Sequence, residues 1–326
     1  YGICGGCSFQ HLSSQDQISA KQSWLQSAFM GQAKVLPKQW LEPLQVESWG
    51  YRRKARLGVR YVNKKDKVLV GFRERKSSFI TVMDRCEVLH PLLGDNLELL
   101  GECIEKLSVK FHVPQIEVAI AELDTILILR HLQPLTREDE IILQEYGEKL
   151  KVTWYTQSGG LETIKPLTEA VSLNYSLPDH NIKMTFLPTD FTQINFELNQ
   201  KMINLTLQLL DLNKNDEVID LFCGLGNFTL PISRYVKTVV GIEGDSGLVE
   251  RAKENARQNG VSNASFYKAD LFEDVSGFEW FRGKKYNKAL IDPARSGAIE
   301  IVELLLKLNV ERLVYVSCNP STLARD

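Results

Sequence analysis

The loop Asp220-Leu221-Phe222-Cys223-Gly224-Leu225-Gly226-Asn227-Phe228 decides the fold of this chain. It begins within the last residues of an apolar run at 217–222 and leads into a segment with helical periodicity. Glycines at such a junction let the backbone approach a ligand. A tight turn without a ligand is one alternative. A dinucleotide site is another, but that site requires a third glycine at position 229, where this chain has threonine.

Outward from this loop, short apolar runs alternate with amphipathic segments to the end of the chain. The expected strands are 217–222, 237–242, 264–268, 288–291 and 312–316, and the expected helices include 195–210, 246–259 and 298–308. Short apolar strands interleaved with helices are typical of a parallel sheet that is covered on both faces. The sequence therefore predicts an α/β, Rossmann-like, doubly wound domain over residues 183–326.

Four successive predicted strands end in or near an acidic residue: Asp220, Glu243, Asp270 and Asp292. In a doubly wound sheet the carboxyl ends of the strands form the ligand crevice. A negative crevice suits S-adenosylmethionine, which carries a sulfonium, an ammonium and ribose hydroxyls. We expect Glu243 to bind the ribose and Asp270 to reach the adenine edge. Two loop residues are expected to add contacts, namely Phe222 and Asn227.

The last predicted strand runs into Ser317-Cys318-Asn319-Pro320. A buried structural cysteine is the alternative, but this thiol lies at the crevice end of the strand and before a proline. A thiolate that adds to carbon 6 of uracil makes carbon 5 nucleophilic enough to accept a methyl group. We therefore predict Cys318 as the catalytic nucleophile. Arg295 in Asp292-Pro293-Ala294-Arg295 stands where amino-group methyltransferases usually carry an aromatic residue.

Residues 1–182 mix short alternating runs with helical segments, which predicts an α+β domain. The whole chain has a net charge of −2, but Tyr51–Ile80 holds eleven Lys or Arg against Asp66 and Glu74. Local basic surface matters more for nucleic-acid binding than the total charge. We predict RNA contacts here, although a solvated strand face is the alternative. The residues chosen for these contacts are Arg52, Arg53 and Arg56, and the further basic residues expected on phosphates are Lys54, Arg60, Arg73, Arg75 and Lys76.

The chain has six cysteines, and two of them form Cys4-Gly5-Gly6-Cys7. A zinc site and a redox pair are both compatible with this spacing. So few, unevenly spread thiols favour a reducing compartment, so we expect a cytoplasmic protein. Neither a signal peptide nor an apolar run of about 18 residues is visible, so no membrane partner is expected.

Several motifs together resemble those of the RNA uracil-C5 methyltransferases. They are Phe191-Thr192-Gln193-Ile194-Asn195, the 220–228 loop, Asp292-Pro293-Ala294-Arg295 and 317–326. The resemblance covers essentially the whole chain, and it implies a monomeric enzyme that methylates 23S ribosomal RNA with Cys318 as nucleophile. The cofactor residues that it implies are Gln193, Phe222, Asn227, Glu243, Asp270 and Asp292.

The same resemblance implies a [4Fe–4S] cluster on Cys4, Cys7 and Cys86, with a further ligand six residues before Cys4. Cys103 matches no ligand and is expected in the core. The family's N-terminal β-barrel domain is not in this chain, and its catalytic glutamate is expected beyond Asp326, so the methyltransferase domain is expected to lack its C-terminal part. A chain that ended there would form the cysteine adduct without releasing product.

Three alternatives stay open on the sequence alone. The target could be a uracil of transfer RNA or another uracil of 23S ribosomal RNA, because specificity depends largely on the RNA-binding parts. A non-catalytic RNA-binding module is the alternative from a different class. An intact Cys318 together with the crevice acids argues against that module. An amino-group methyltransferase is the remaining alternative, and Arg295 and the Cys318 motif argue against it.

Overall fold

The computed structural model describes residues 2–308 and 310–326, which form two compact units. The first unit comprises Tyr1–Ser14, Val46–Tyr175 and Leu187–Phe196, and the second comprises Gln15–Gln45, Ser176–Phe186 and Glu197–Asp326. The predicted division into 1–182 and 183–326 stays a prediction, because the compact units exchange segments across that boundary.

The first unit is built on a six-stranded sheet with the order β2-β1-β3-β4-β5-β6. All neighbours pair antiparallel except β4 and β5, which are parallel. The strands are β1 (Lys54–Val62), β2 (Lys67–Gly71), β3 (Gln115–Ile120), β4 (Thr125–Arg130), β5 (Thr153–Gln157) and β6 (Lys165–Pro166). Such a largely antiparallel sheet agrees with the α+β character that the sequence predicts.

Two amphipathic helices bury their apolar faces against this sheet. They are α3 (Leu97–Lys106) and α4 (Arg137–Leu150), and the short α2 (Pro91–Gly94) precedes them. Leucines and isoleucines from both helices share one core with β1 and β3. Thr136 begins α4 with a capping box, because its hydroxyl accepts from the Asp139 amide while the Asp139 carboxylate accepts from the Thr136 amide.

The second unit holds a five-stranded, fully parallel sheet with the order β11-β10-β9-β12-β13. Its strands are β9 (Glu217–Leu221), β10 (Thr238–Glu243), β11 (Ala264–Lys268), β12 (Lys288–Ile291) and β13 (Arg312–Tyr315). The predicted doubly wound sheet is thus confirmed. The strand order reverses between β9 and β12, and in such sheets ligands bind at this switch point, beyond the carboxyl ends of the strands.

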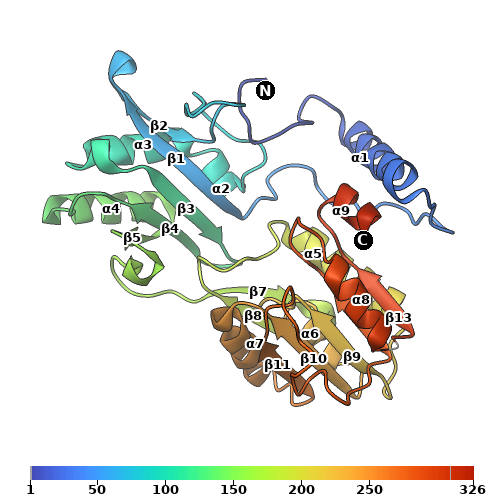
Figure 1. Ribbon diagram of the computed structural model, residues 1–326. Coiled ribbons are helices and arrows are strands. Elements are labelled where there is room, and N and C mark those ends of the chain that lie inside the picture. The colour runs from blue at the N-terminus through green and yellow to red at the C-terminus, as the bar shows by residue number, and fades with distance from the viewer. Residues whose placement is uncertain (1, 309) are drawn as a thin grey trace. The chain divides into compact units, whose positions relative to one another are not determined.

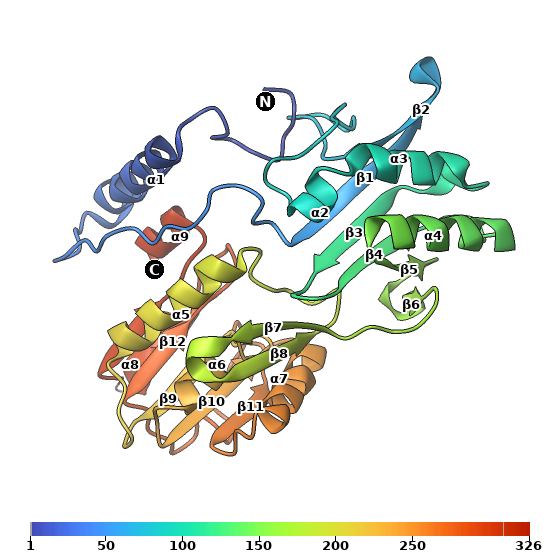
Figure 2. The same ribbon diagram turned by 180° about the vertical axis from the view of Figure 1, so that it is seen from behind.

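Helices cover both faces of the parallel sheet (Figures 1 and 2). In Figure 1, α8 lies in front of the sheet, and the reversed view of Figure 2 brings α5 to the front. The helices of this unit are α5 (Phe196–Leu210), α6 (Thr229–Ser233), α7 (Ser246–Gln258), α8 (Ile299–Lys307) and α9 (Pro320–Arg325). The remaining elements are α1 (Ser14–Ala28) and the strand pair β7 (Leu173–Leu177) and β8 (Ile182–Phe186). Within the described residues, no helix is long and apolar enough to cross a membrane.

Candidate functional site

The glycine loop after β9 has an unusual backbone. Phe222, Gly224 and Gly226 all have positive φ, at 65°, 55° and 94°. Glycine adopts this conformation freely, but in phenylalanine it costs on the order of 1–3 kcal/mol and is found mostly at functional sites. A Cβ on Gly224 would meet no atom within 4 Å, so the backbone there faces open space. The loop is therefore shaped so that a ligand can approach its backbone.

Asp220 lies at the centre of this site and is completely buried. Its Oδ2 accepts a hydrogen bond of 2.5 Å from the Thr229 hydroxyl, which begins α6. Among the described residues, its Oδ1 has no hydrogen-bond partner. Burial raises the pKa of Asp220 to about 7, and the nearby charges of Asp292 and Glu243 act in the same direction. This carboxyl group is thus held partly protonated near neutral pH.

Asp292 lies across the switch point from Asp220. The parallel register pairs Leu290 with Asp220 and Ile291 with Leu221, so Asp292 follows directly at the end of β12. Burial raises the pKa of Asp292 to about 6. The buried Asp220 and the half-buried Asp292 interact electrostatically, and this pair favours a cation, because a cation stabilises the charged forms of both carboxyl groups.

Glu243 ties the glycine loop to β10. Its Oε2 accepts from the Gly224 amide at 3.0 Å and its Oε1 accepts from the Asp245 amide at 3.0 Å. Asp245 in turn caps α7 by accepting from the Leu248 amide at 2.8 Å. Glu243 therefore fixes the loop shape, and each of its oxygens keeps capacity to accept from a ligand hydroxyl.

The remaining sequence-predicted cofactor residues have different surroundings. Asp270 is exposed after β11 and accepts from the Phe272 amide at 3.0 Å. The Phe222 and Phe272 rings lie 5.9 Å apart, which adds an aromatic wall beside Asp270. Gln193 belongs to the first unit, so its place in the cofactor site stays a prediction.

Asn227 has a partner that sequence reasoning missed. Its side-chain amide exchanges two hydrogen bonds of 2.9 Å with Asn199 on α5. Thr229 was missed as well, although a threonine in place of a third glycine at the start of a helix is a visible signal. No local pattern announces Asn199, because it precedes its partner by 28 residues.

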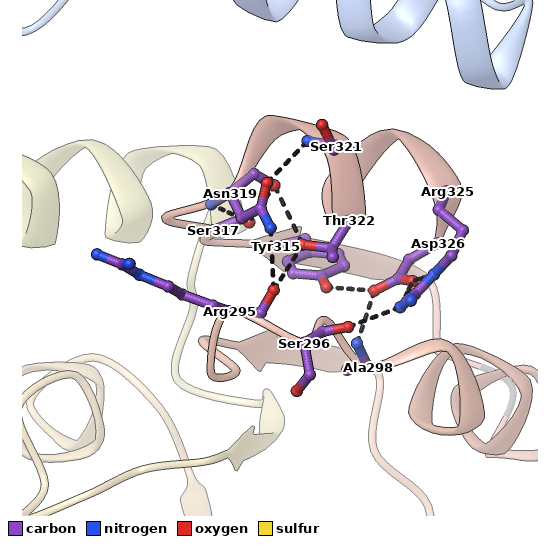
Figure 3. A network of polar contacts seen from close by, with 10 residues as sticks. All are labelled: Arg295, Ser296, Ala298, Tyr315, Ser317, Asn319, Ser321, Thr322, Arg325 and Asp326. Atoms are coloured by element: carbon purple, nitrogen blue, oxygen red, sulfur yellow. Dashed lines mark hydrogen bonds and ion pairs between the residues drawn. The ribbon is translucent and has the colours of Figure 1, made fainter. Parts of the chain in front are cut away.

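Cys318 lies between β13 and α9 and is exposed. The residues around it are tied to the segment after β12 (Figure 3). The carbonyl oxygen of Arg295 accepts from the Asn319 side-chain amide at 3.1 Å and from the Thr322 hydroxyl at 3.2 Å. Asn319 also caps α9, because its Oδ1 accepts from the Ser321 amide at 3.1 Å. The exposed thiol thus stands on a segment that its neighbours hold in place.

A second set of contacts holds α9 from its other end (Figure 3). The Asp326 Oδ2 accepts from the Ala298 amide and from the Tyr315 hydroxyl, both at 2.6 Å. Gly297 makes this approach possible, because it has a φ of 81° and a Cβ there would lie 2.5 Å from that oxygen. The β12–α8 loop therefore positions the cysteine segment.

The predicted RNA-binding arginines have three different environments. Arg53 is half-buried, donates to the Ala121 carbonyl at 3.0 Å and lies 4.9 Å from the centre of the Phe196 ring. Arg56 is exposed and pairs with Glu117 at 2.9 Å. Arg52 lines the small pocket that also contains Cys4, Cys7 and Cys86. Of these three side chains, Arg56 is the exposed one, and the contacts of all three with RNA stay predictions.

Cys4, Cys7 and Cys86 line one pocket of about 160 Å³. Burial raises the pKa of Cys7, and the charges of Cys86 and Cys4 raise it further. Thr81 lines the same pocket and has a buried hydroxyl without a partner in the described part of the chain. No group of three or more His, Cys, Asp or Glu side chains within residues 2–308 and 310–326 has the geometry to hold a metal ion. The thiols therefore share a pocket but do not converge on one point.

Cys103 is buried on α3, as the sequence predicts, and burial raises the pKa of its thiol to about 12. Cys223 is also buried, and its pKa is raised well above the ordinary value for the same reason. Neither thiol is readily ionised, so neither resembles a nucleophile. Of the cysteines in the second unit, Cys318 is the exposed one.

The parallel sheet, the left-handed glycine loop and the carboxyl groups at the strand ends define an α/β methyltransferase. The family model described as tRNA (Uracil-5-)-methyltransferase matches residues 15–326. The chain belongs to this family, which confirms the resemblance to the RNA uracil-C5 methyltransferases, and it is an enzyme that uses S-adenosylmethionine.

Curated relatives and a solved structure agree with this assignment. The 23S rRNA (uracil(1939)-C(5))-methyltransferase RlmD of Vesicomyosocius okutanii is 66% identical over the whole chain, which covers 74% of that relative. The RlmD of Nitrosococcus oceani is 50% identical, and the chain covers 73% of it. The tRNA (uracil-54, C5)-methyltransferase of Pyrococcus abyssi, solved with S-adenosyl-L-homocysteine, has a TM-score of 0.73 at 21% identity. That match covers 99% of this chain and 78% of the solved chain, and it supports the fold.

Proposed function

We propose that this chain transfers a methyl group from S-adenosylmethionine to carbon 5 of uracil 1939 in 23S ribosomal RNA. The observation that carries the proposal is 66% identity over the full chain to a relative with this named activity. The exposed Cys318 and the buried carboxyl groups at the switch point support it. We further propose that the enzyme is a cytoplasmic monomer.

The cofactor site is proposed from the fit of the residues to a cationic ligand. The Asp220 Oδ1, which has no partner in the part of the chain that the structure describes, and the open backbone at Gly224 are the features that a bound cation and its polar groups would complete. Glu243 would accept from ribose hydroxyls, and Asp270 would accept from the adenine edge beside Phe272. The full proposed set is Gln193, Phe222, Asn227, Glu243, Asp270 and Asp292.

When bound, S-adenosylmethionine supplies an electrophilic methyl group. The role of Cys318 is to add as a thiolate to carbon 6 of the target uracil, which moves an electron pair onto the ring and makes carbon 5 nucleophilic. After methylation a base removes the proton from carbon 5, and the thiolate leaves. An exposed thiol suits this role, because the target base must be turned out of its stack to reach it.

Covalent trapping tests this proposal. Ribosomal RNA that contains 5-fluorouracil cannot lose the carbon-5 substituent as a proton, so the adduct accumulates and migrates as a protein–RNA band. We expect the band with wild type and with the control Cys103→Ala, and no band with Cys318→Ala. Wild-type protein with cofactor and RNA that gave no band would refute the proposal and would favour a non-catalytic RNA-binding module.

Transfer RNA is the second candidate substrate, because the matching family model and the solved structure both carry transfer-RNA names. The two targets separate in one experiment. Trapping is performed with equal amounts of fluorouracil-substituted ribosomal and transfer RNA, labelled differently. We expect the ribosomal label in the covalent band, and a band with only the transfer-RNA label would replace the first substrate with the second.

We also propose that Cys4, Cys7 and Cys86 hold a [4Fe–4S] cluster. The fit rests on three thiols around one pocket and on the Thr81 hydroxyl, which has no partner within residues 2–308 and 310–326. Arg52 and Arg85 also line the pocket and offset thiolate charge. Anaerobic reconstitution should give the broad visible absorption of an iron–sulfur cluster, and Cys7→Ser should abolish it. Stoichiometric zinc with no such absorption would contradict this assignment.

The predicted RNA contacts of Arg52, Arg53 and Arg56 remain a proposal. Their different environments give different expectations. Arg56→Gln should weaken RNA binding at unchanged stability, because the side chain is exposed. Arg53→Gln should instead lower stability, because its guanidinium donates inside the first unit.

A further inference from the structure

A basic hairpin follows β2 in the first unit. Phe72–Thr81 folds back on itself, with the Glu74 amide donating to the Phe79 carbonyl at 2.9 Å and the Thr81 amide donating to the Phe72 carbonyl at 2.9 Å. Lys76 at its tip has a φ of 57°, which is uncommon for a residue with a side chain. The hairpin thus has a defined shape that presents Lys76 outward.

The N-terminal segment pairs with this hairpin and fixes it. The Gly5 amide donates to the Arg73 carbonyl and the Arg75 amide donates to the Ile3 carbonyl, both at 2.8 Å. The Arg75 guanidinium also donates to the Cys7 carbonyl at 3.0 Å. These contacts hold an exposed basic segment in one conformation, so less entropy is lost when it binds a ligand.

A cavity of about 690 Å³ lies along the hairpin, and we call it the hairpin cavity. It falls within the roughly 300–1,000 Å³ typical of small-molecule ligand pockets. Four cationic side chains line it, against one carboxylate, that of Glu74. The cationic residues are Arg56, Arg73, Arg75 and Lys76.

The four cations differ in how much of their charge is free. Arg56 pairs with Glu117, and Arg75 donates to a backbone carbonyl. Arg73 and Lys76 are exposed and have no ion pair among the described residues. These two side chains are therefore the ones best placed to bind an anion.

The hairpin also carries an exposed aromatic ring. Phe79 is 61% exposed, although a ring of this size usually packs in a core. Ser77 and Ser78 line the cavity next to it and offer hydroxyl donors. Cations and hydroxyls suit phosphate groups, and an exposed ring suits an unpaired base, so the combination favours single-stranded nucleic acid.

We propose that the hairpin cavity binds the backbone phosphates of a single-stranded RNA segment, with Arg73 and Lys76 on phosphates and Phe79 stacked on a base. The choice of RNA over another polyanion rests on the proposed function. None of the residues that line the hairpin cavity belongs to the proposed cofactor set.

Salt-dependent binding tests the proposal. Fluorescence anisotropy with a short single-stranded ribosomal RNA segment compares wild type with the double variant Arg73→Gln/Lys76→Gln. Each lost phosphate contact lowers the slope of log K against log salt by about 0.7 on single strands, so the double variant should lose about 1.4. At physiological salt this corresponds to roughly tenfold weaker binding. Phe79→Ala should weaken binding roughly tenfold with an unchanged slope.

Lys64→Gln/Lys65→Gln is the matched control, because both lysines are exposed in the same unit at the turn between β1 and β2 and the charge change is equal. It should keep the wild-type slope. Unchanged binding by the hairpin variants, or equal losses in the control, would overturn the proposal. The proposal would also be overturned if the hairpin variants lost binding to anionic vesicles or acidic peptides but bound RNA as wild type does. Thermal midpoints confirm that each variant is folded.

Trapping with fluorouracil RNA distinguishes this proposal from the proposed function. At saturating RNA the hairpin variants should form the Cys318 adduct as wild type does. If wild type forms the adduct and the hairpin variants show no binding defect, RNA binding in the hairpin cavity is refuted and the proposed function is not. A binding defect in the variants with no adduct in wild type would support the cavity and refute the methyl transfer.

Discussion

Replacing Asp220 with asparagine should stabilise the cofactor-free protein at alkaline pH. Burial raises the pKa of this carboxyl group from 3.8 to about 7. The folded state therefore holds a proton that the unfolded state releases between about pH 4 and pH 7, so stability falls as pH rises through that window. Asparagine has a similar shape and cannot ionise, so the variant escapes this loss.

The magnitude follows from the pKa values of the folded and unfolded states. A tenfold difference in acidity between the two states corresponds to about 1.4 kcal/mol, so full ionisation of Asp220 costs about 4 kcal/mol. Asp220→Asn should gain about 1 kcal/mol at pH 4.5 and about 4 kcal/mol at pH 8.5. The Thr229 hydroxyl can still donate to the side-chain oxygen of asparagine, so that hydrogen bond is retained.

Hydrogen exchange in increasing urea is the assay, because the amides of β9 and β12 report the unfolding of the second unit by itself. Asp270→Asn is the control, since it removes an exposed carboxylate after β11 in the same sheet. Equal effects of Asp220→Asn at the two pH values would show that burial does not control this group. The variant should also bind S-adenosylmethionine more weakly by calorimetry, because it removes a negative charge from the crevice.

Three further predictions follow from the second unit. Affinity for S-adenosylmethionine should rise between about pH 5 and pH 8 and then level off. The reason is that the bound cation must displace protons from Asp220 and Asp292, whose pKa values are about 7 and about 6. Calorimetry at constant ionic strength measures the affinity, and no rise with pH would contradict this. Gly297→Ala should lower the rate of adduct formation at unchanged cofactor affinity. The added Cβ would lie 2.5 Å from the Asp326 Oδ2, so it displaces Asp326 and the cysteine segment with it. Single-turnover trapping measures the rate, and a wild-type rate would count against this prediction. Lys288→Met should lower the free energy of unfolding by about 3–5 kcal/mol, because it leaves the buried Asp216 carboxylate without the cation that lies 2.7 Å away. The double variant Asp216→Asn/Lys288→Met should recover part of this loss, as measured by urea unfolding.

Much of the fold of the second unit could be predicted from the sequence, because its signals are local. The helix expected at 195–210 is observed as Phe196–Leu210, and the five expected parallel strands are all present. Apolar runs between amphipathic segments leave few other ways to bury their surface. The acids at the strand ends could be predicted for the same reason, since strand ends in a parallel sheet meet at one edge.

The environment of the basic residues could not be predicted, because it depends on contacts between distant parts of the chain. Arg53 reaches a carbonyl 68 residues away, and Lys54 donates to the Asp190 carbonyl 136 residues away. Burial lowers the pKa of Lys54 to about 8. Counting Lys and Arg residues in the sequence assumes that their charges are exposed, although Arg53 and Lys54 make contacts that stabilise the first unit. On the hairpin, by contrast, Arg73 and Lys76 are exposed.

The crevice of the second unit contains features that lower the stability of the free protein. Phe222 holds a positive φ, and Asp220 is buried with one oxygen unpartnered among the described residues. Together these cost several kcal/mol, which is a large part of the stability of an ordinary domain. A purely structural turn gains nothing from either feature. Binding of a cation offsets the cost at Asp220, because the cation favours the charged carboxylate. The features that lower the stability of the free protein are therefore also those that point most directly to a cofactor.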